Sequence, residues 1–302
     1  MNKLFNFNIH SHHYLKVKLI LPTLFILLPL STFSEIREFQ TTWSKSTAGT
    51  GVGSILMDEA NSVNPAPLGF FQMGSVYFQK TDATFSDGEG QELNKGGDTT
   101  AVIISDAKGA LKGSVSYYKY SERFDQRKQY SVSIASPVLE KSAFGVTYKL
   151  TKDRLSGNGT IYNETKTYQT IFGVMHAVSN NFTIGLVAKD PIKKKENDTQ
   201  GILGFQYVYE DFISIMFDAG TNYYKPLEEE FLYRGAFQVK VFSDFFLRAG
   251  IYNDKGIKEK GTGIGIGWVG PKLVLNVALK NTEETDTSEK IKETALSLSY
   301  KF

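Results

Sequence analysis

One histidine and a set of charged side chains are the residues of this sequence that could do chemistry. Of the four histidines, His10, His12 and His13 lie in the basic, apolar leader at the start of the chain. A Ser-His-acid triad would therefore depend on His176 alone, and the chain contains no cysteine that could serve as a nucleophile or thiolate ligand. No Gly-x-Ser-x-Gly, paired-carboxylate or metal-ligand spacing accompanies His176. We therefore expect neither an enzyme nor a bound metal or cofactor.

Three cations lie on strand-like segments: Arg234, Lys240 and Arg248. A guanidinium or ammonium group in an otherwise apolar path could hold the carboxylate of an amphipathic ligand. The alternative is a network of ion pairs, with the acidic partners Asp58 and Glu59 supplied by the N-terminal part of the chain. The same set of candidate contacts also includes Asp218, Met216 and Phe246.

The elements that would position these residues are β-strands. From residue 68 onward the chain alternates between apolar and polar residues in about fourteen segments of about ten residues, the length that a tilted strand needs to cross a bilayer. Segment 272–280 is a clear case, with leucines or valine at 273, 275, 277 and 279 and polar residues at 272, 276 and 280. The alternation predicts strands with one apolar and one polar face.

The links between these segments alternate in length along the chain. Short links, such as 179–180 and 243–244, follow every second segment, and longer, charged links such as 81–97 and 153–165 follow the others. Transmembrane barrels show this pattern because their periplasmic turns are short and their outer loops longer. Link 136–142 is an exception, since it is long where a short turn is expected. An even number of strands predicts that both termini lie in the periplasm.

Two packed sheets of a soluble protein are the alternative to a barrel. The apolar face of the segments is rich in aromatic residues, while the other face carries basic residues such as Lys149, Lys189 and Lys280. A dry sandwich core cannot hold so many charges without partners, whereas a hydrated lumen can. With 22 Phe and 16 Tyr the chain also has material for aromatic girdles. We therefore predict an all-β, antiparallel transmembrane barrel in an outer membrane, with the apolar face of each strand toward the lipid.

Three regions are expected along the 302 residues. Residues 1–34 contain a basic leader, a short apolar run and small residues, which predicts a secretory signal peptide. Residues 35–67 are rich in small residues and precede the barrel, 68–302; about two helical turns are expected within 54–60, ended by the prolines that follow. The net charge of +2 gives no reason to expect a nucleic-acid partner.

The last segment ends the chain on an aromatic residue. Its apolar positions are Leu296, Leu298, Tyr300 and Phe302. As the closing strand it must pair with the first strand, and its apolar residues should face lipid. We expect it to be the signal that the barrel assembly machinery recognises.

Residues 47–68 resemble the N-terminal motif of the FadL/TodX family of outer-membrane transport proteins. In that family a small-residue stretch leads to an acidic position, matched here by Asp58 or Glu59, and then to an Asn-Pro-Ala-Gly-Leu signature. Here the signature is Asn64, Pro65 and Ala66 followed by a proline, where the family has glycine, and then leucine. The resemblance implies a fourteen-stranded barrel whose N-terminal segment folds inside as a hatch, and transport of long-chain fatty acids or aromatic hydrocarbons.

The chain departs from that family in its short loops and mixed lumen. Family members tend to be longer and to carry extended outer loops, whereas the longest link expected here, 81–97, is polar. The leading hypothesis is passive uptake of a small hydrophobic molecule past the hatch. The alternative is a barrel that does not transport and serves as a structural or secretion-system partner.

Overall fold

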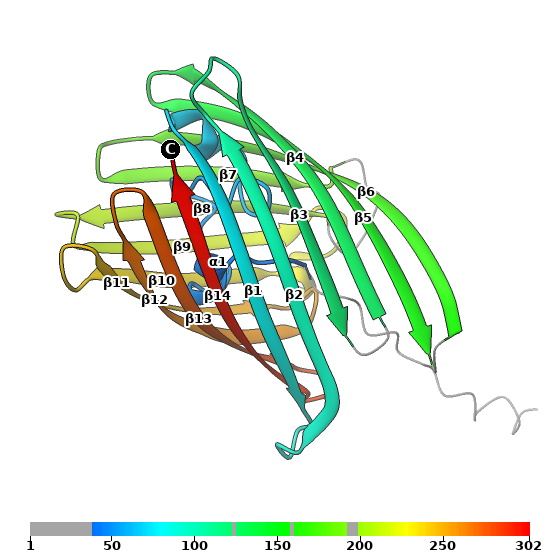
Figure 1. Ribbon diagram of the computed structural model, residues 1–302. Helices are drawn as coiled ribbons and strands as arrows, with labels where there is room; N and C mark the ends of the chain where they lie inside the picture. Colours follow the sequence, from blue (N-terminus) through cyan, green and yellow to red (C-terminus); the bar gives the residue numbers. More distant parts are fainter. Residues whose placement is uncertain (1–37, 123–124, 158–159, 192–198) are drawn as a thin grey trace, which may run out of the picture. The chain divides into compact units, whose positions relative to one another are not determined.

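Fourteen antiparallel strands close into a barrel in the computed structural model of this protein (Figure 1). The structure describes residues 38–122, 125–157, 160–191 and 199–302. Each strand pairs with its neighbours in the sequence, and the first pairs with the last, so the barrel has no free edge. The predicted fold class is confirmed. The predicted signal peptide, 1–34, lies outside the described residues.

The strands differ widely in length. In chain order they are β1 (Gly74–Ser86), β2 (Glu92–Asp106), β3 (Lys112–Glu122), β4 (Asp125–Leu139), β5 (Ser142–Gly157), β6 (Thr160–Ala177), β7 (Phe182–Lys189), β8 (Gln200–Tyr209), β9 (Ile213–Asn222), β10 (Leu232–Lys240), β11 (Phe245–Asp254), β12 (Glu259–Val269), β13 (Leu273–Glu284) and β14 (Lys290–Lys301). The longest are β5 and β6, with 16 and 18 residues, followed by β2 and β4 with 15 residues each.

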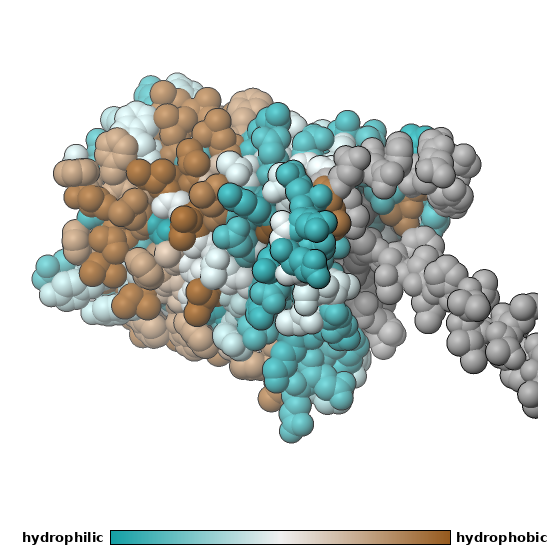
Figure 2. Space-filling model, turned by 90° about the horizontal axis from the view of Figure 1, so that it is seen from below, coloured by the Kyte–Doolittle hydropathy of each residue, from teal (hydrophilic) through white to brown (hydrophobic). Residues whose placement is uncertain are grey.

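Apolar side chains cover much of the outer face of the wall. Large apolar residues that are exposed alternate with buried residues along the strands, and examples are Phe78, Val132, Leu186, Ile215, Ile251, Ile264 and Leu296. Figure 2 shows apolar side chains gathered over one stretch of the surface, with hydrophilic side chains clustered beyond it. In water such a surface would be unstable, but facing lipid it is the surface that a transmembrane barrel needs.

The two ends of the barrel differ in their links. One end, called here the short-turn end, has the links 107–111, 140–141, 178–181, 210–212, 241–244 and 270–272. The long link expected at 136–142 is wrong, because β4 continues to Leu139 and pairs with β5 as far as the two-residue turn. The opposite end is called the loop end.

At the loop end several links are shorter than the sequence predicts, although 190–199 and 223–231 are slightly longer. Between β1 and β2 only residues 87–91 lie outside the strands, where the expected loop was 81–97. Pairs such as Asp82 with Asp98 continue the ladder beyond the apolar stretch. Hydrophobic alternation indicates which residues face lipid. The backbone hydrogen bonds between strands continue beyond the last alternating residue, so the strands are longer than the alternation predicts.

Residues 38–73, called here the inner segment, precede β1. They contain the helix α1 (Thr42–Ser46) and the 3-10 helix η1 (Ala66–Phe70). Residues 54–60 form turns, so the helix expected there is wrong. Thr41 caps α1 by accepting a hydrogen bond from the Ser44 amide at 3.1 Å. Apart from these, α2 (Leu227–Glu230) lies in the link between β9 and β10.

Among the described residues, no helix is long and apolar enough to cross a membrane.

Candidate functional site

The inner segment lies within the barrel, where it contacts the inner face of most strands. α1 packs against β11 to β14, and η1 packs against β3 to β6, on the far side of the wall (Figure 1). Val52 and Val63 form an apolar cluster with wall residues from four strands, namely Ile171, Val187, Ile202 and Leu232. Apolar lumen residues therefore form a core with the inner segment.

Two lysines of the wall hold the first described residue of the inner segment. The Glu38 carboxylate pairs with Lys149 at 3.2 Å and with Lys189 at 3.3 Å. Burial acts to raise the pKa of Glu38, but the two ammonium groups outweigh it and hold that pKa well below its usual range. Lys45 of α1 pairs with Glu293 of β14 at 2.5 Å. Charged residues of the wall and of the inner segment thus neutralise each other inside the lumen.

Asp218 and Arg234 stand directly opposite each other on β9 and β10, and both bind the inner segment. The Asp218 carboxylate accepts the amides of Gly51 and Val52, at 2.9 and 3.2 Å. The Arg234 guanidinium donates to the carbonyl of Gly49 at 2.9 Å. Of the predicted lumen contacts, these two therefore hold the backbone of residues 49–52.

The other predicted lumen contacts lie apart from this pair. The Arg248 guanidinium donates to Gln238 at 2.7 Å and to Asn276 at 2.8 Å, so it is held by the wall. Lys240 and Phe246 face each other at the short-turn end of β10 and β11, and both are half-buried. Met216 is buried in the lumen. Their role in ligand binding remains a prediction.

The residues of the N-terminal motif tie the inner segment to itself and to the barrel seam. The Asn64 side chain donates to the Val52 carbonyl at 2.8 Å and accepts the Ala66 amide at 3.0 Å, and Pro65 precedes the first turn of η1. The Asp58 carboxylate accepts hydroxyl hydrogen bonds from the two strands at the seam, from Ser75 and Ser299.

Glu59 is a buried carboxyl group that forms no ion pair in the described part of the chain. It accepts hydrogen bonds from the hydroxyls of Thr41 and Ser62. Burial raises the pKa of Glu59 to about 7, the neighbouring Asp58 adds to the rise, and Arg248 opposes it. Burial likewise raises the pKa of Asp58. Glu59 thus stabilises the inner segment itself, and Asp58 binds that segment to β1 and β14.

Glycines of the wall face one another in pairs wherever the inner segment approaches most closely. The cross-strand pairs are Gly145 with Gly173, Gly185 with Gly204, and Gly250 with Gly263. A Cβ atom at Gly145 would stand 2.6 Å from the carbonyl carbon of Pro65, and one at Gly204 would stand 2.6 Å from the amide of Gly53. At Gly250 and Gly263 it would meet the backbone of α1 and the residue after it.

These three glycine pairs are functional positions that sequence reasoning missed. Each removes the side chains from a small area of wall, so that the backbone of the inner segment lies directly on the backbone of the strands. The signal was visible in segment 261–267, where every inward position is glycine while the outward positions are threonine or isoleucine. An inward face without side chains implies that another backbone occupies the space.

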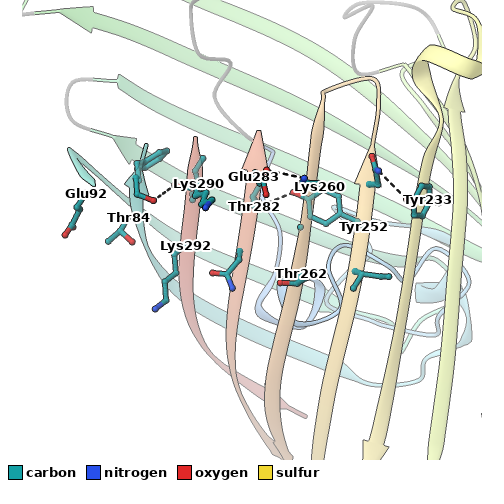
Figure 3. A pocket seen from close by; sticks show the side chains of 17 residues that line it. Thr84, Glu92, Tyr233, Tyr252, Lys260, Thr262, Thr282, Glu283, Lys290 and Lys292 are labelled. Carbon is teal, nitrogen blue, oxygen red and sulfur yellow. Dashed lines mark hydrogen bonds and ion pairs between the residues drawn. The ribbon is translucent and has the colours of Figure 1, made fainter. Parts of the chain in front are cut away.

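A cavity of about 680 Å³ lies at the loop end, between β1 and strands β10 to β14 (Figure 3). The inward side chains that line it include Phe85, Tyr252, Thr282 and Ile291. Tyr252 reaches over Gly261 of the intervening strand and donates to the Thr282 hydroxyl at 3.0 Å. These inward side chains give the cavity an aromatic and aliphatic part, and its lining also includes the charged residues Glu92, Lys260, Glu283, Lys290 and Lys292.

Next to the cavity, toward the short-turn end, a wall residue contacts the inner segment. Lys280 lies two residues from Thr282 on the inward face of β13, and its ammonium group lies 4.7 Å from the centre of the Tyr252 ring. The same group donates to the Gln40 side chain at 2.9 Å. Since Gln40 belongs to the inner segment, Lys280 connects that segment with Tyr252, one of the residues that line the cavity.

Within the described residues, no group of three or more His, Asp or Glu side chains could hold a metal ion. His176 lies on the outer face of β6, where its Nδ1 contacts the Ser142 hydroxyl at 2.8 Å.

The fold and the occupied lumen define a fourteen-stranded barrel that encloses its own N-terminal segment, and solved structures of this architecture exist. No family model and no curated protein matches the sequence. The monoaromatic hydrocarbon channel CymD is similar in structure, with a TM-score of 0.68 at 13% identity over 86% of this chain and 96% of that one. The Pseudomonas putida toluene transporter TodX gives 0.65 at 10% identity, covering 88% and 98%.

A Pseudomonas aeruginosa FadL homologue gives a TM-score of 0.59 at 11% identity, covering 88% of this chain and 99% of that one. The chain thus has the fold of the FadL/TodX-type channels over nearly their whole length, and the resemblance seen in residues 47–68 is confirmed at the level of fold.

Proposed function

We propose that the protein lies in an outer membrane and lets small hydrophobic molecules, such as monoaromatic hydrocarbons or fatty acids, pass inward without energy input. The observation that carries the proposal is the cavity at the loop end, whose lining residue Tyr252 lies against Lys280, a wall residue that binds the inner segment. Its volume lies within the range of ordinary ligand pockets, about 300–1,000 Å³. The shared architecture with hydrocarbon and toluene channels supports the same function.

The lining of the cavity favours an apolar ligand. Phe85 and Ile291 are packed together with Ala83 and, partly buried, Leu93. An aromatic or alkyl ligand would displace water from these side chains, which is favourable by about 25 cal/mol for each Å² of apolar surface removed from water. Tyr252 and Thr282 add polar atoms that could orient a ligand carrying a carboxylate.

In this proposal residues 35–67 act as a hatch. The ligand passes the hatch through a local rearrangement around Asn64, Pro65 and Ala66. In this proposal the short-turn end, where Phe302 pairs with Gly74, faces the periplasm.

Uptake into liposomes tests the proposal. Liposomes carrying the purified barrel should take up toluene or a fluorescent fatty acid faster than empty ones. Ile291→Glu puts a carboxylate into the cavity and should reduce uptake toward that of empty liposomes, whereas Thr294→Glu changes an outward residue of the same strand and should not. Equal uptake by protein-containing and empty liposomes would refute transport, provided that heat-modifiable gel mobility shows a folded barrel.

A structural or secretion-system role is the second candidate. It is favoured by the use of Asp218, Arg234, Lys149 and Lys189 to bind the inner segment rather than to line an open path. Such a barrel would show no uptake of either ligand and would co-purify with a stable protein partner.

A further inference from the structure

Four lysines stand side by side on the outer face of the wall. Lys119 is directly opposite Lys128 across β3 and β4, Lys128 is opposite Lys152 across β4 and β5, and Lys152 is opposite Lys166 across β5 and β6. All four are on the outward parity of their strands. They form one uninterrupted row across four strands, called here the lysine row.

The lysine row borders the lipid-facing surface. The next row toward the short-turn end consists of Tyr117, Tyr130, Leu150 and Tyr168, again directly opposite one another. Further along the same strands lie exposed apolar residues such as Val132 and Val174. Aromatic residues gather where the wall of a transmembrane barrel meets the headgroups. Ammonium groups just beyond them lie among headgroups.

The lysine row has no ion-pair partner among the described residues. Three other exposed lysines do pair with carboxylates: Lys80 with Asp82, Lys258 with Asp286 and Lys260 with Glu283. Within the row, the Lys152 ammonium group lies 5.7 Å from the centre of the Tyr130 ring.

Like charges directly opposite each other destabilise a sheet. Four like charges in succession repel one another, although the strands that carry them pair regularly. Anions bound from outside the chain would reduce this repulsion. Neighbouring strands are about 4.8 Å apart, so one phosphate group can accept hydrogen bonds from two adjacent ammonium groups. Since strands of such barrels tilt by about 35–45°, the row crosses the wall obliquely, and successive lysines meet headgroups at different depths.

We propose that the lysine row binds the phosphate groups of anionic lipid headgroups in the leaflet at the loop end. A membrane lipid fits better than a soluble anion, because the aromatic row and the apolar face below it offer a surface for the acyl chains of the same molecule. The proposal rests on the membrane placement given above but not on transport, and it holds for a barrel that conducts nothing.

Lipid retention tests the lysine row. The triple variant Lys128→Gln, Lys152→Gln and Lys166→Gln is compared with a matched triple, Lys258→Gln, Lys260→Gln and Lys290→Gln, which removes the same charge from exposed positions elsewhere at the loop end. Each protein is reconstituted into nanodiscs of phosphatidylcholine alone, or with diphosphorylated lipid A or phosphatidylglycerol. Native mass spectrometry after release counts the lipids that remain bound.

The wild-type barrel should retain anionic lipid and not phosphatidylcholine. The row triple should lose about a hundredfold in affinity, from about fivefold for each lysine near an anionic surface, and the matched triple should change little. Replacing the same three residues by arginine should preserve retention, which distinguishes lost charge from lost folding. Equal retention by both glutamine triples, or equal thermal stabilisation by inorganic phosphate and by lipid, would overturn the proposal.

Discussion

The glycine pairs make a quantitative prediction about how firmly the inner segment is held. In the double variant Gly185→Ala and Gly204→Ala, the new methyl groups would meet the backbone of Val52 and Gly53. At Gly185 the nearest atoms belong to the backbone of Val52, and at Gly204 they are a carboxylate oxygen of Asp218 and the amide of Gly53. Because Asp218 itself binds the amides of Gly51 and Val52, the inner segment must shift with it. Overpacking of this kind destabilises by about 1–3 kcal/mol at each site.

Taking about 2 kcal/mol for one substitution, the ratio of displaced to docked inner segment rises about thirtyfold. Two substitutions at adjoining positions do not add fully, because one shift relieves both contacts. The assay is single-channel conductance in planar bilayers, with limited proteolysis of residues 38–67 as a second measurement. Both open-channel events and cleavage should increase.

Gly235→Ala is the matched control. A Cβ atom there meets nothing within 4 Å, so the variant should conduct and resist protease like the wild type. If the double variant also behaves like the wild type, the wall glycines do not serve the close approach of the inner segment. Deletion of residues 38–67 sets the upper limit of conductance in the same experiment.

Other measurements address the remaining contacts. Asp218→Asn removes the charge that the amides of Gly51 and Val52 bind, so the docked state should lose about 2 kcal/mol and conductance should rise. The raised pKa of Glu59, about 7, means that docking is strongest below the ordinary pKa of 4.5 and weakens as the pH rises to about 7. Protease resistance at pH 5 and pH 8 should show this difference, on the order of 3 kcal/mol, and Glu59→Gln should abolish it. Deleting Phe302 should lower the yield of assembled barrel in the outer membrane, measured by heat-modifiable mobility, while Ser179→Ala should not. A single cysteine at Ser179 should escape an impermeant maleimide on intact cells and one at Asp286 should react, and N-terminal sequencing of the membrane form should begin near Glu35.

The strands of the barrel are predictable from sequence because lipid selects for apolar residues at alternate positions. Leu296, Leu298 and Tyr300 are all exposed on the outside, as their parity indicates. Prediction fails where strands leave the apolar band, as at the ends of β5 and β6, because polar residues on both faces give no alternation although the backbone continues to pair.

The inner segment is less predictable than the wall. Its helix lies at Thr42–Ser46 rather than within 54–60, because capping by Thr41 and contacts with the wall outweigh the weak helical preference of a short stretch. The glycine pairs escaped prediction for a different reason. Glycine in a strand weakens it in isolation, and only the backbone seated against it shows why it is there. The sequence predicts that Asp218 and Arg234 are lumen residues. It does not predict that both bind the backbone of residues 49–52, because a backbone partner leaves no pattern of side chains in the sequence.

The seam between β1 and β14 constrains the order of events during biogenesis. Gly74 and Phe302 exchange backbone hydrogen bonds of 2.9 and 3.0 Å, so the ring closes between the residue just after the inner segment and the last residue of the chain. Once it has closed, residues 38–73 can reach their place only by threading through an end of a lumen whose walls they fill. Since residues 38–73 precede every strand in the sequence, we expect them to lie beside a half-open sheet and to be enclosed when β14 pairs with β1. The inner segment would then serve as a template on which the wall closes.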